Sequence, residues 1–473
     1  MLFKPGTILH VIGLCLVALL RLSGCSGEGT GKDHAKASTS AAQKEKPSPK
    51  KARKKKSEEK KKRSNEKNNS FIVTGKYDGP NPAGRWGEQR VDSGPRLASW
   101  QQEQFDKLEA MGYVQGSQKA LKEGGITRYV HKKTQDGLNF YISGHDTVAY
   151  LMDMEGKVLH QWRFPFKKAW NKYPGHVNAV HSLFWRRAYL YENGDLLCIF
   201  EGMGMIKIDK DSNLIWKSPL HEHHDMTVAD NGDIYTLTRE GHIIERINPK
   251  KPVVEDFLTV LDSDGNLKKR VSLIEAMERS PEPMPYWDKK RLNKGDIFHT
   301  NTVFLLDGKI AQKMPAFTAG RVLVSMFYLN AIFVVDVDKE QMVWGYADDF
   351  KTQHDPHILP NGHLLLFDNQ GGDRALGGSR ILEYALPQMK RVWTYEGTET
   401  DKFFTRTCGT VQRLANGNTL ITETDNGRAF EVTRLGKIVW EFISPHRAGP
   451  NNELVASLFE MKRIPKSYAA WLK

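Results

Sequence analysis

The stretch QHDPHILPNGHLLLFDN at residues 353–369 contains the unit from which this fold is built. A segment of strand length leads into Asn361-Gly362, and the apolar run HLLLF follows. Asn-Gly is a strong signal for a two-residue β-hairpin turn, because both residues tolerate the positive φ angles of such a turn. The stretch therefore predicts a strand, a tight turn and a second strand, with His354 opening the first strand.

The same unit occurs at two other places in the chain. His224 stands seven residues before the turn Asn231-Gly232, as His354 does before its turn, and His299 stands eight residues before the turn Asp307-Gly308. The apolar runs DIYTL and KIAQK follow these two turns and predict the second strand of each hairpin. We expect the three histidines to open equivalent strands. If those strands converge on one axis, the imidazoles converge too, as ionisable groups do at a reaction centre.

A second repeated feature is a polar turn followed by an aliphatic run that closes on tryptophan. One copy, near Val271, lacks the tryptophan, and one gap is lengthened by residues 273–296, which read as an inserted loop. The other copies end at Trp162, Trp216, Trp344, Trp393 and Trp440.

Six copies at a spacing of about fifty residues predict an all-β fold, a six-bladed β-propeller. An array of β-sandwiches would not explain six copies of the same strand pattern. We expect each tryptophan to fill the wedge between neighbouring blades, where a buried indole contributes roughly 2 to 4 kcal/mol.

Ligand sites on a propeller gather at the opening where the innermost strands begin. At the phase of the three histidines, the first clear blade offers Arg186 and the last offers Cys408-Gly409. Arg406 and Arg428 are further candidates for anion contacts, and Phe404 is a candidate wall for an aromatic substrate.

The N-terminus predicts export. Lys4 precedes the apolar run ILHVIGLCLVALL, and the small residues before Cys25 resemble a bacterial lipoprotein cleavage box. We expect residues 1–24 to be a signal peptide and Cys25 to carry the lipid that anchors the mature protein in the cell envelope, in the periplasm or at the outer membrane. Plain secretion and an uncleaved anchor helix are the alternatives.

Most of the positive charge lies in a lysine-rich segment. Residues 31–70 hold fifteen Lys or Arg and five Asp or Glu, so +10 of the net charge of +13 belongs to these forty residues. They contain no aromatic residue and cannot bury a core, which predicts a disordered tether over residues 25–75. We expect a connecting region with one short helix over 76–130 and the propeller over 131–473. Because the propeller is nearly neutral, the basic pI does not predict a nucleic-acid partner.

Several longer pieces resemble the bacterial arylsulfate sulfotransferase family of exported six-bladed propellers. The match runs from about Gly137 to about Trp440, and its most specific pieces are HHDMTVADNGDIY, FHTNTVFLLDG, QHDPHILPNGHLLLFDNQGGDR and GTVQRLANGNTLIT. The resemblance implies transfer of a sulfuryl group from a phenolic sulfate to a phenol, through a sulfohistidine, with no nucleotide donor and no cofactor. The sequence also lacks the glycine-rich lysine loop that holds nucleotide phosphates.

The resemblance also implies site residues. His299 and His354 align with family active-site histidines, Arg374 aligns with the family arginine, and His224 lies in a shared blade motif. The segment FFTRTCGTVQ offers no counterpart to the family's nucleophilic histidine. An arginine suits sulfate because its planar fork binds two oxygens, and its charge disfavours a neighbouring imidazolium.

Two other functions remain open from the sequence: a non-catalytic propeller that binds an anion or carbohydrate, and a metal hydrolase. Strand alternation places His221, His223 and Asp225 on one face and His224 on the other, so a metal site that uses all four is not expected. The C-terminal residues 455–473 are interpreted as a closing helix or a docking segment.

Overall fold

The computed structural model describes 118–119, 123–175, 177–178, 180–282, 284, 295–448 and 454–472, and the description below concerns these residues. The expected signal peptide, the lipidation site Cys25, the lysine-rich tether and the short helix near 100–111 lie outside them. None of the helices in the described part is long and apolar enough to cross a membrane.

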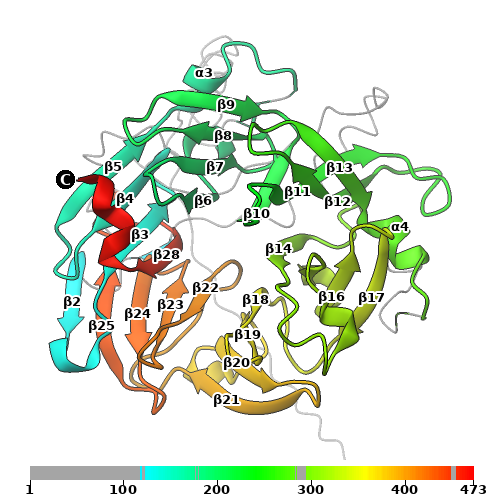
Figure 1. The fold of residues 1–473 in the computed structure, drawn as a ribbon. Coiled ribbons are helices and arrows are strands. Elements are labelled where there is room, and N and C mark those ends of the chain that lie inside the picture. Colours follow the sequence, from blue (N-terminus) through cyan, green and yellow to red (C-terminus); the bar gives the residue numbers. More distant parts are fainter. Residues whose placement is uncertain are drawn as a thin grey trace, which may run out of the picture. The chain divides into compact units, whose positions relative to one another are not determined.

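The six-bladed propeller is confirmed. Six antiparallel sheets surround one axis (Figure 1), and each tryptophan-closed segment supplies the fourth strand of a blade. From the innermost strand outwards, blades 1 to 3 consist of β28 (Leu458–Ile464), β3 (Leu138–Ser143), β4 (Val148–Met152) and β5 (Val158–Arg163); β6 (Arg187–Leu190), β7 (Leu196–Phe200), β8 (Gly204–Ile208) and β9 (Leu214–Ser218); and β10 (Glu222–Val228), β11 (Ile234–His242), β12 (Val253–Leu261) and β13 (Leu267–Ser272).

The remaining blades follow the same order, and blade 6 carries a fifth strand. They consist of β14 (Thr300–Leu305), β15 (Val322–Met326), β16 (Ala331–Asp336) and β17 (Gln341–Tyr346); β18 (His354–Ile358), β19 (Leu364–Asp368), β20 (Arg380–Ala385) and β21 (Lys390–Glu396); and β22 (Thr410–Arg413), β23 (Thr419–Glu423), β24 (Arg428–Val432), β25 (Ile438–Ile443) and β2 (Gly125–Tyr129).

The ring closes through segments from both ends of the described chain. β28 is the innermost strand of blade 1, where Leu458 pairs with Ser143, and β2 pairs with β25 at the outer edge of blade 6. The expectation of a closing helix or docking segment at the C-terminus was therefore wrong for 458–464. These residues pair with a strand that lies more than 300 positions earlier in the sequence, and no local sequence pattern predicts such a pairing.

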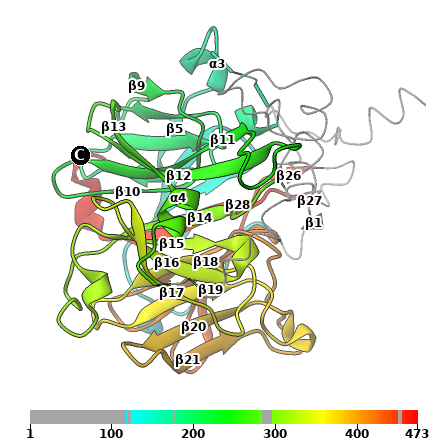
Figure 2. The same cartoon turned by 90° about the vertical axis from the view of Figure 1, so that its right-hand side faces the viewer.

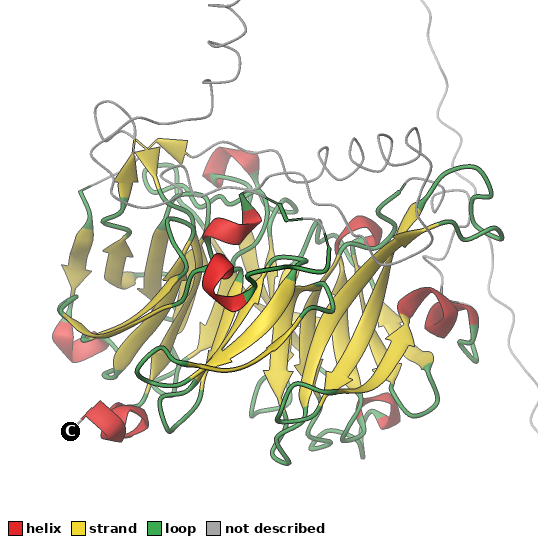
Figure 3. Ribbon diagram, turned by 90° about the horizontal axis from the view of Figure 1, so that it is seen from above, coloured by secondary structure: helices red, strands yellow, loops and turns green. Residues whose placement is uncertain are grey.

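The loops carry short helices and one small sheet. Figure 3 shows the helices outside the blades, and Figure 2 shows the small sheet and the C-terminal helix on opposite sides of the disc. The sheet contains β1 (Gln118–Lys119), β27 (Leu454–Val455) and β26 (Arg447–Ala448). The helices are α3 (Phe166–Ala169), α4 (Leu273–Glu278) and the 3-10 helices η1 (His131–Lys133), η2 (His181–Leu183), η3 (Pro315–Phe317), η4 (Phe327–Leu329), η5 (Arg374–Leu376) and η6 (Lys466–Leu472).

Blade 4 differs from the sequence prediction. KIAQK, at 309–313, is not a strand; these residues form turns that lead into η3, and the second strand of this blade begins at Val322. The turn at Asp307-Gly308 therefore opens a long loop instead of a tight hairpin. The inserted loop that begins at residue 273 starts with α4, whose N-cap Ser272 accepts a hydrogen bond from the Glu275 N–H.

Four of the tryptophans that close the fourth strands join one blade to the next. The indole N–H of each donates to a carbonyl in a turn of the following blade, at 2.9 to 3.0 Å. The pairs are Trp162 with Gly194, Trp216 with Ser263, Trp393 with Arg434 and Trp440 with Met154. The tryptophan therefore supplies both apolar area and one directed bond between blades.

Polar contacts also link the innermost strands around the channel. Arg187 lies 2.8 Å from Asp225 of blade 3 and 2.8 Å from Glu460 of blade 1. Val303 N–H donates to Asp225, and Val411 N–H donates to Asp355. A cavity of about 230 Å³ lies among these strands, and it is lined by side chains of all six blades.

Candidate functional site

The five residues predicted to face the opening stand at or near the starts of innermost strands. His224 lies in β10, His299 directly precedes β14, His354 is the first residue of β18, Arg186 directly precedes β6, and Cys408 stands two residues before β22. All five side chains are buried. In blade 1 the equivalent place before the innermost strand belongs to Ser457, which the C-terminal segment supplies.

A left-handed backbone conformation occurs at three of these five residues, His224, His299 and Cys408. His224 has a φ of 56° and His299 has a φ of 51°, in the left-handed region that residues with a side chain rarely adopt. In β10 the register with β11 shifts between His223 and Met226, as at a β-bulge. Backbone of this kind costs about 1 kcal/mol or more per residue and is concentrated at functional sites.

The bulge in β10 corrects the prediction that His223 and His224 face opposite ways. Their Nδ1 atoms lie 2.8 Å apart, so both imidazoles point into one cluster. Asp225 instead points toward the channel, where it meets Arg187. The period-two rule for strands fails here because the register shift and the positive φ of His224 break the alternation.

His299 forms a pair with Asp296. Its Nδ1 lies 2.6 Å from Asp296 Oδ2, and its backbone N–H donates to Asp296 Oδ1 at 3.1 Å. A carboxylate accepts a hydrogen bond and cannot donate one, so it holds the neutral imidazole with the proton on Nδ1 and the lone pair on Nε2. The His299 ring lies 4.9 Å from the His224 ring and 5.4 Å from Tyr328, which is 43% exposed.

His354 is held differently. Its Nδ1 lies 2.8 Å from Asn369 Oδ1 and 3.0 Å from the Thr352 carbonyl, and the Cys408 N–H donates to its Nε2 at 3.2 Å. Burial, helped by the positive charge of Arg186, lowers the pKa of His354 to about 3, so the ring is neutral at pH 7. Both ring nitrogens bond to this chain, an arrangement that suits a positioning role.

Two buried arginines supply positive charge beside the histidines. Burial lowers the pKa of His224 well below its usual value, and the charges of Arg186 and Arg239 add to that effect. Arg239 lies in β11, and its Nη2 is 3.9 Å from Glu201 Oε1. The apolar alternation in IYTLTREGH does not mark this arginine as a site residue, and the sequence analysis missed it together with Glu201 and Asp296.

Arg374, which the resemblance implied as a catalytic arginine, and the predicted substrate contacts Arg406 and Phe404 lie farther out on the loops. Arg374 is exposed in η5, Arg406 is exposed, and Phe404 is 39% exposed. The side chains of Arg374 and Phe404 both lie near Gly378. Within the described part of the chain, no hydrogen bond or ion pair joins any of the three to His224, His299 or His354.

Arg428 has a structural environment. It is buried in blade 6, where its guanidinium lies 3.0 Å from Asp401, 3.2 Å from Glu423 and 2.7 Å from Glu441. Three carboxylates therefore surround a side chain that the sequence suggested as an anion contact. We leave Arg428 out of the site.

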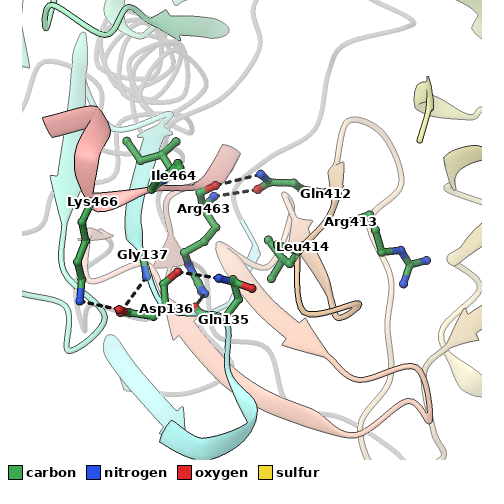
Figure 4. Close-up of a pocket in the computed structure, with 11 residues that line it drawn as sticks. Gln135, Asp136, Gly137, Gln412, Arg413, Leu414, Arg463, Ile464 and Lys466 are labelled. Carbon is green, nitrogen blue, oxygen red and sulfur yellow. Dashed lines mark hydrogen bonds and ion pairs between the residues drawn. The ribbon is translucent and has the colours of Figure 1, made fainter. Parts of the chain in front are cut away.

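A groove of about 460 Å³ lies on the opposite face, between blades 6 and 1 (Figure 4). It adjoins the ends of β22 and β28, whereas the histidines lie at the beginnings of the inner strands. Its charged groups are paired: Lys466 lies 2.7 Å from Asp136, and Arg463 lies 2.9 Å from Glu431. The groove is therefore separate from the histidine cluster.

The family model for arylsulfotransferase (ASST) matches residues 187–445, more than half of the chain. The chain belongs to the arylsulfotransferase family. The matched region contains five of the six blades, including His224, His299 and His354. No curated protein matches the chain.

The solved structures compared with this arylsulfotransferase family member have low sequence identity to it. The Cps50 (Swd1) β-propeller domain of Myceliophteria thermophila is 13% identical, with a TM-score of 0.42 and coverage of 71% of this chain and 99% of that domain. Virginiamycin B lyase from Staphylococcus aureus is 11% identical, with a TM-score of 0.37 and coverage of 72% and 98%. A Bacteroides caccae protein of unknown function is 12% identical, with a TM-score of 0.38 and coverage of 65% and 94%. The six-bladed architecture stands on the strand pairing described above.

Proposed function

We propose that this arylsulfotransferase family member transfers a sulfuryl group from an aryl sulfate ester to a phenolic acceptor, with His299 as the nucleophile. The observation that supports this choice is the 2.6 Å contact between Asp296 and Nδ1 of His299, which leaves the lone pair on Nε2. His354 has its Nε2 occupied by the Cys408 amide and is proposed to orient the site.

The reaction takes place in two steps. The Nε2 lone pair of His299 attacks sulfur, an N–S bond forms, and the S–O bond to the aryl group breaks, so the phenolate leaves with the electron pair. The oxygen of the acceptor phenol then attacks sulfur, and the N–S bond breaks with return of its electrons to the imidazole. The proton of the acceptor passes to the departed phenolate, so the histidine is regenerated unchanged.

The surrounding charges suit a sulfate ester. Sulfuryl transfer resembles phosphoryl transfer in requiring positioning and charge stabilisation more than covalent help from many side chains. We assign Arg186 to binding of the sulfate oxygens, supported by its burial beside these rings and its effect on the pKa values of His224 and His354. Arg374, Arg406 and Phe404, on exposed loops, are proposed to meet the aryl groups at the mouth.

The test is transfer from 4-nitrophenyl sulfate to phenol. We expect wild type to release nitrophenolate, and to gain the mass of one SO₃ group when the acceptor is left out. His299→Asn should reduce the rate on the order of a thousandfold or more and abolish the mass gain. His363→Asn is the matched control, because His363 binds Glu383 in the turn between β18 and β19.

Failure of folded wild type to release nitrophenolate with any phenolic acceptor would overturn the proposal and favour an anion-binding propeller without catalysis. Sulfuryl transfer that persists at the wild-type rate in His299→Asn would overturn the choice of nucleophile.

We also propose that a lipid on Cys25 tethers the protein to the cell envelope, from the lipoprotein-like box in the sequence. Expression in a bacterium fed labelled palmitate tests this, because Cys25→Ser should lose the label. Equal labelling of both proteins contradicts the proposal.

A further inference from the structure

A buried cluster of three ionisable side chains joins blades 2 and 3 beside the proposed site. Glu201 follows β7, while His223 and His224 lie in β10. The three side chains are almost completely inaccessible to solvent. One carboxylate oxygen and one nitrogen from each ring lie within 4.8 Å of one another. The three residues therefore offer convergent oxygen and nitrogen atoms in one place.

One contact in this cluster matches the spacing of atoms that share a small cation, and another is about 0.5 Å shorter. His223 Nδ1 lies 2.8 Å from His224 Nδ1, and His224 Nδ1 lies 3.3 Å from Glu201 Oε1. Atoms bound to a tetrahedral zinc ion at about 2.0 to 2.2 Å stand about 3.3 to 3.5 Å apart, so small rotations of the rings reach that geometry.

A carboxylate lies on the other side of the His223 ring. His223 Nε2 is 3.6 Å from Asp256 Oδ1, an ion-pair distance that is longer than a hydrogen bond. Asp256 is itself fixed by the Thr300 N–H at 2.7 Å. A histidine that faces a carboxylate through one nitrogen and a metal through the other is the usual arrangement at protein metal sites.

One proton lies at the centre of this cluster. The 2.8 Å contact between the two Nδ1 atoms requires a proton on one of them, and Glu201 Oε1 lies 3.3 Å from His224 Nδ1. A divalent ion that replaced this proton would be bound by all three atoms.

The ligand types select the class of ion. Two imidazole nitrogens and one carboxylate suit zinc and similar transition metals, whereas magnesium and calcium prefer sites made of oxygen. Arg239, whose Nη2 lies 3.9 Å from Glu201 Oε1, and Arg186 both place positive charge beside the cluster. The carboxylates of Glu201, 3.3 Å from His224 Nδ1, and of Asp256, 3.6 Å from His223 Nε2, oppose that charge.

We propose that Glu201, His223 and His224 bind one divalent transition-metal ion of the zinc class. This site goes beyond the sulfuryl-transfer proposal and does not depend on it. A metal held there would fix His224, whose ring packs against His299.

The test uses the full chain, stripped with a chelator and titrated with Co²⁺. We expect one ion per chain, visible d–d absorption bands of a four- or five-coordinate site, and displacement of those bands by one equivalent of Zn²⁺. Glu201→Gln and His223→Gln should each weaken binding by at least about tenfold. His242→Gln is the matched control, since it removes another histidine that contacts a carboxylate, Glu255, and it should bind as wild type does.

X-ray absorption of Zn²⁺-loaded wild type provides a readout that needs no variant. We expect two imidazole nitrogens in the first shell. Folded wild type without stoichiometric Co²⁺ binding, a first shell with fewer than two imidazoles, or full binding in both cluster variants overturns the proposal. Because none of these readouts involves an aryl sulfate, the metal site and the sulfuryl-transfer function can fail separately.

Discussion

At the scale of single residues, the partner of each imidazole decides its role. His299 and His354 stand at equivalent places in adjacent blades, yet a carboxylate holds Nδ1 of His299, while an amide and a carbonyl hold Nδ1 of His354. The carboxylate stabilises positive charge on its ring when Nε2 forms a bond, and the amide does not. The chemistry of the two residues therefore differs although their backbone positions match.

Asp296→Asn tests this role of the carboxylate. The amide can donate to Nδ1 of His299 and so select the tautomer whose lone pair faces the wrong way. We expect kcat for aryl sulfate to fall about 10² to 10⁴-fold with little change in KM. Asp307→Asn, in the exposed turn of the same blade, is the control. A kcat equal to that of wild type would show that Asp296 does not orient the nucleophile.

A second histidine pair predicts how stability depends on pH. The rings of His145 and His446 stack at 3.4 Å, and burial lowers the pKa of His446 to about 4 from 6.5. Between these values the unfolded chain binds more protons than the folded chain, so the free energy of unfolding falls as pH falls below about 6.5. The contribution of His446 at pH 5 is about 1 to 2 kcal/mol.

His446→Phe keeps the stacked ring and removes its titration. We expect the difference between the free energies of unfolding at pH 7.5 and pH 5, measured with urea, to shrink by about 1 to 2 kcal/mol. An undiminished pH dependence in this variant would mean that His446 does not titrate on unfolding. The residual pH dependence reports the other buried histidines, His145 among them, whose pKa burial also lowers.

At the scale of elements, the sequence predicted what is encoded locally. The Asn-Gly turns and tryptophan-closed hairpins identified all six blades, because each signal lies within one supersecondary unit. The bulge that unites His223 and His224 was missed, since no residue pattern marks it. Asp296 and Glu201 were missed for a related reason: each precedes or follows a strand in a loop, and only the packing of blades shows what it meets.

The tryptophans should differ in their contribution to stability according to burial. Trp440 is fully buried and Trp216 is partly exposed, although each donates one hydrogen bond of 3.0 Å to the next blade. We expect Trp440→Ala to lower the free energy of unfolding by about 3 to 5 kcal/mol and Trp216→Ala by about 1 to 2 kcal/mol. Denaturant titrations of the wild type and both variants measure the two losses, provided that the m-value is the same in all three proteins. Equal losses would show that the shared hydrogen bond, and not buried area, governs this position.

At the scale of the whole molecule, the ring is closed by residues distant in sequence. β28 brings Glu460 to Arg187 of blade 2 and Phe459 to Phe184, whose ring lies 5.0 Å away. The innermost strand of blade 1 therefore carries packing and charge for two blades. Such contacts have a large loop-closure cost and form only when the other blades are in place.

Two truncations separate the closing strand from the helix that follows it. A stop after Ser457 removes β28, exposes the inner edge of blade 1 and leaves Arg187 without Glu460. A stop after Ile464 keeps β28 and removes η6, whose Trp471 packs 5.5 Å from Trp162 on the outer side of the blade.

We expect the longer protein to unfold in one transition with a Tm lowered by a few degrees, about what a loss of 1 to 2 kcal/mol gives. The shorter protein should lose cooperative unfolding altogether, because an uncovered inner strand edge and a buried guanidinium that keeps only Asp225 of its two carboxylate partners together cost several kcal/mol, a large part of the stability of a domain. Calorimetry distinguishes these outcomes, and a shorter protein that retains a single sharp transition near the wild-type Tm would show that the other five blades hold the ring without the closing strand.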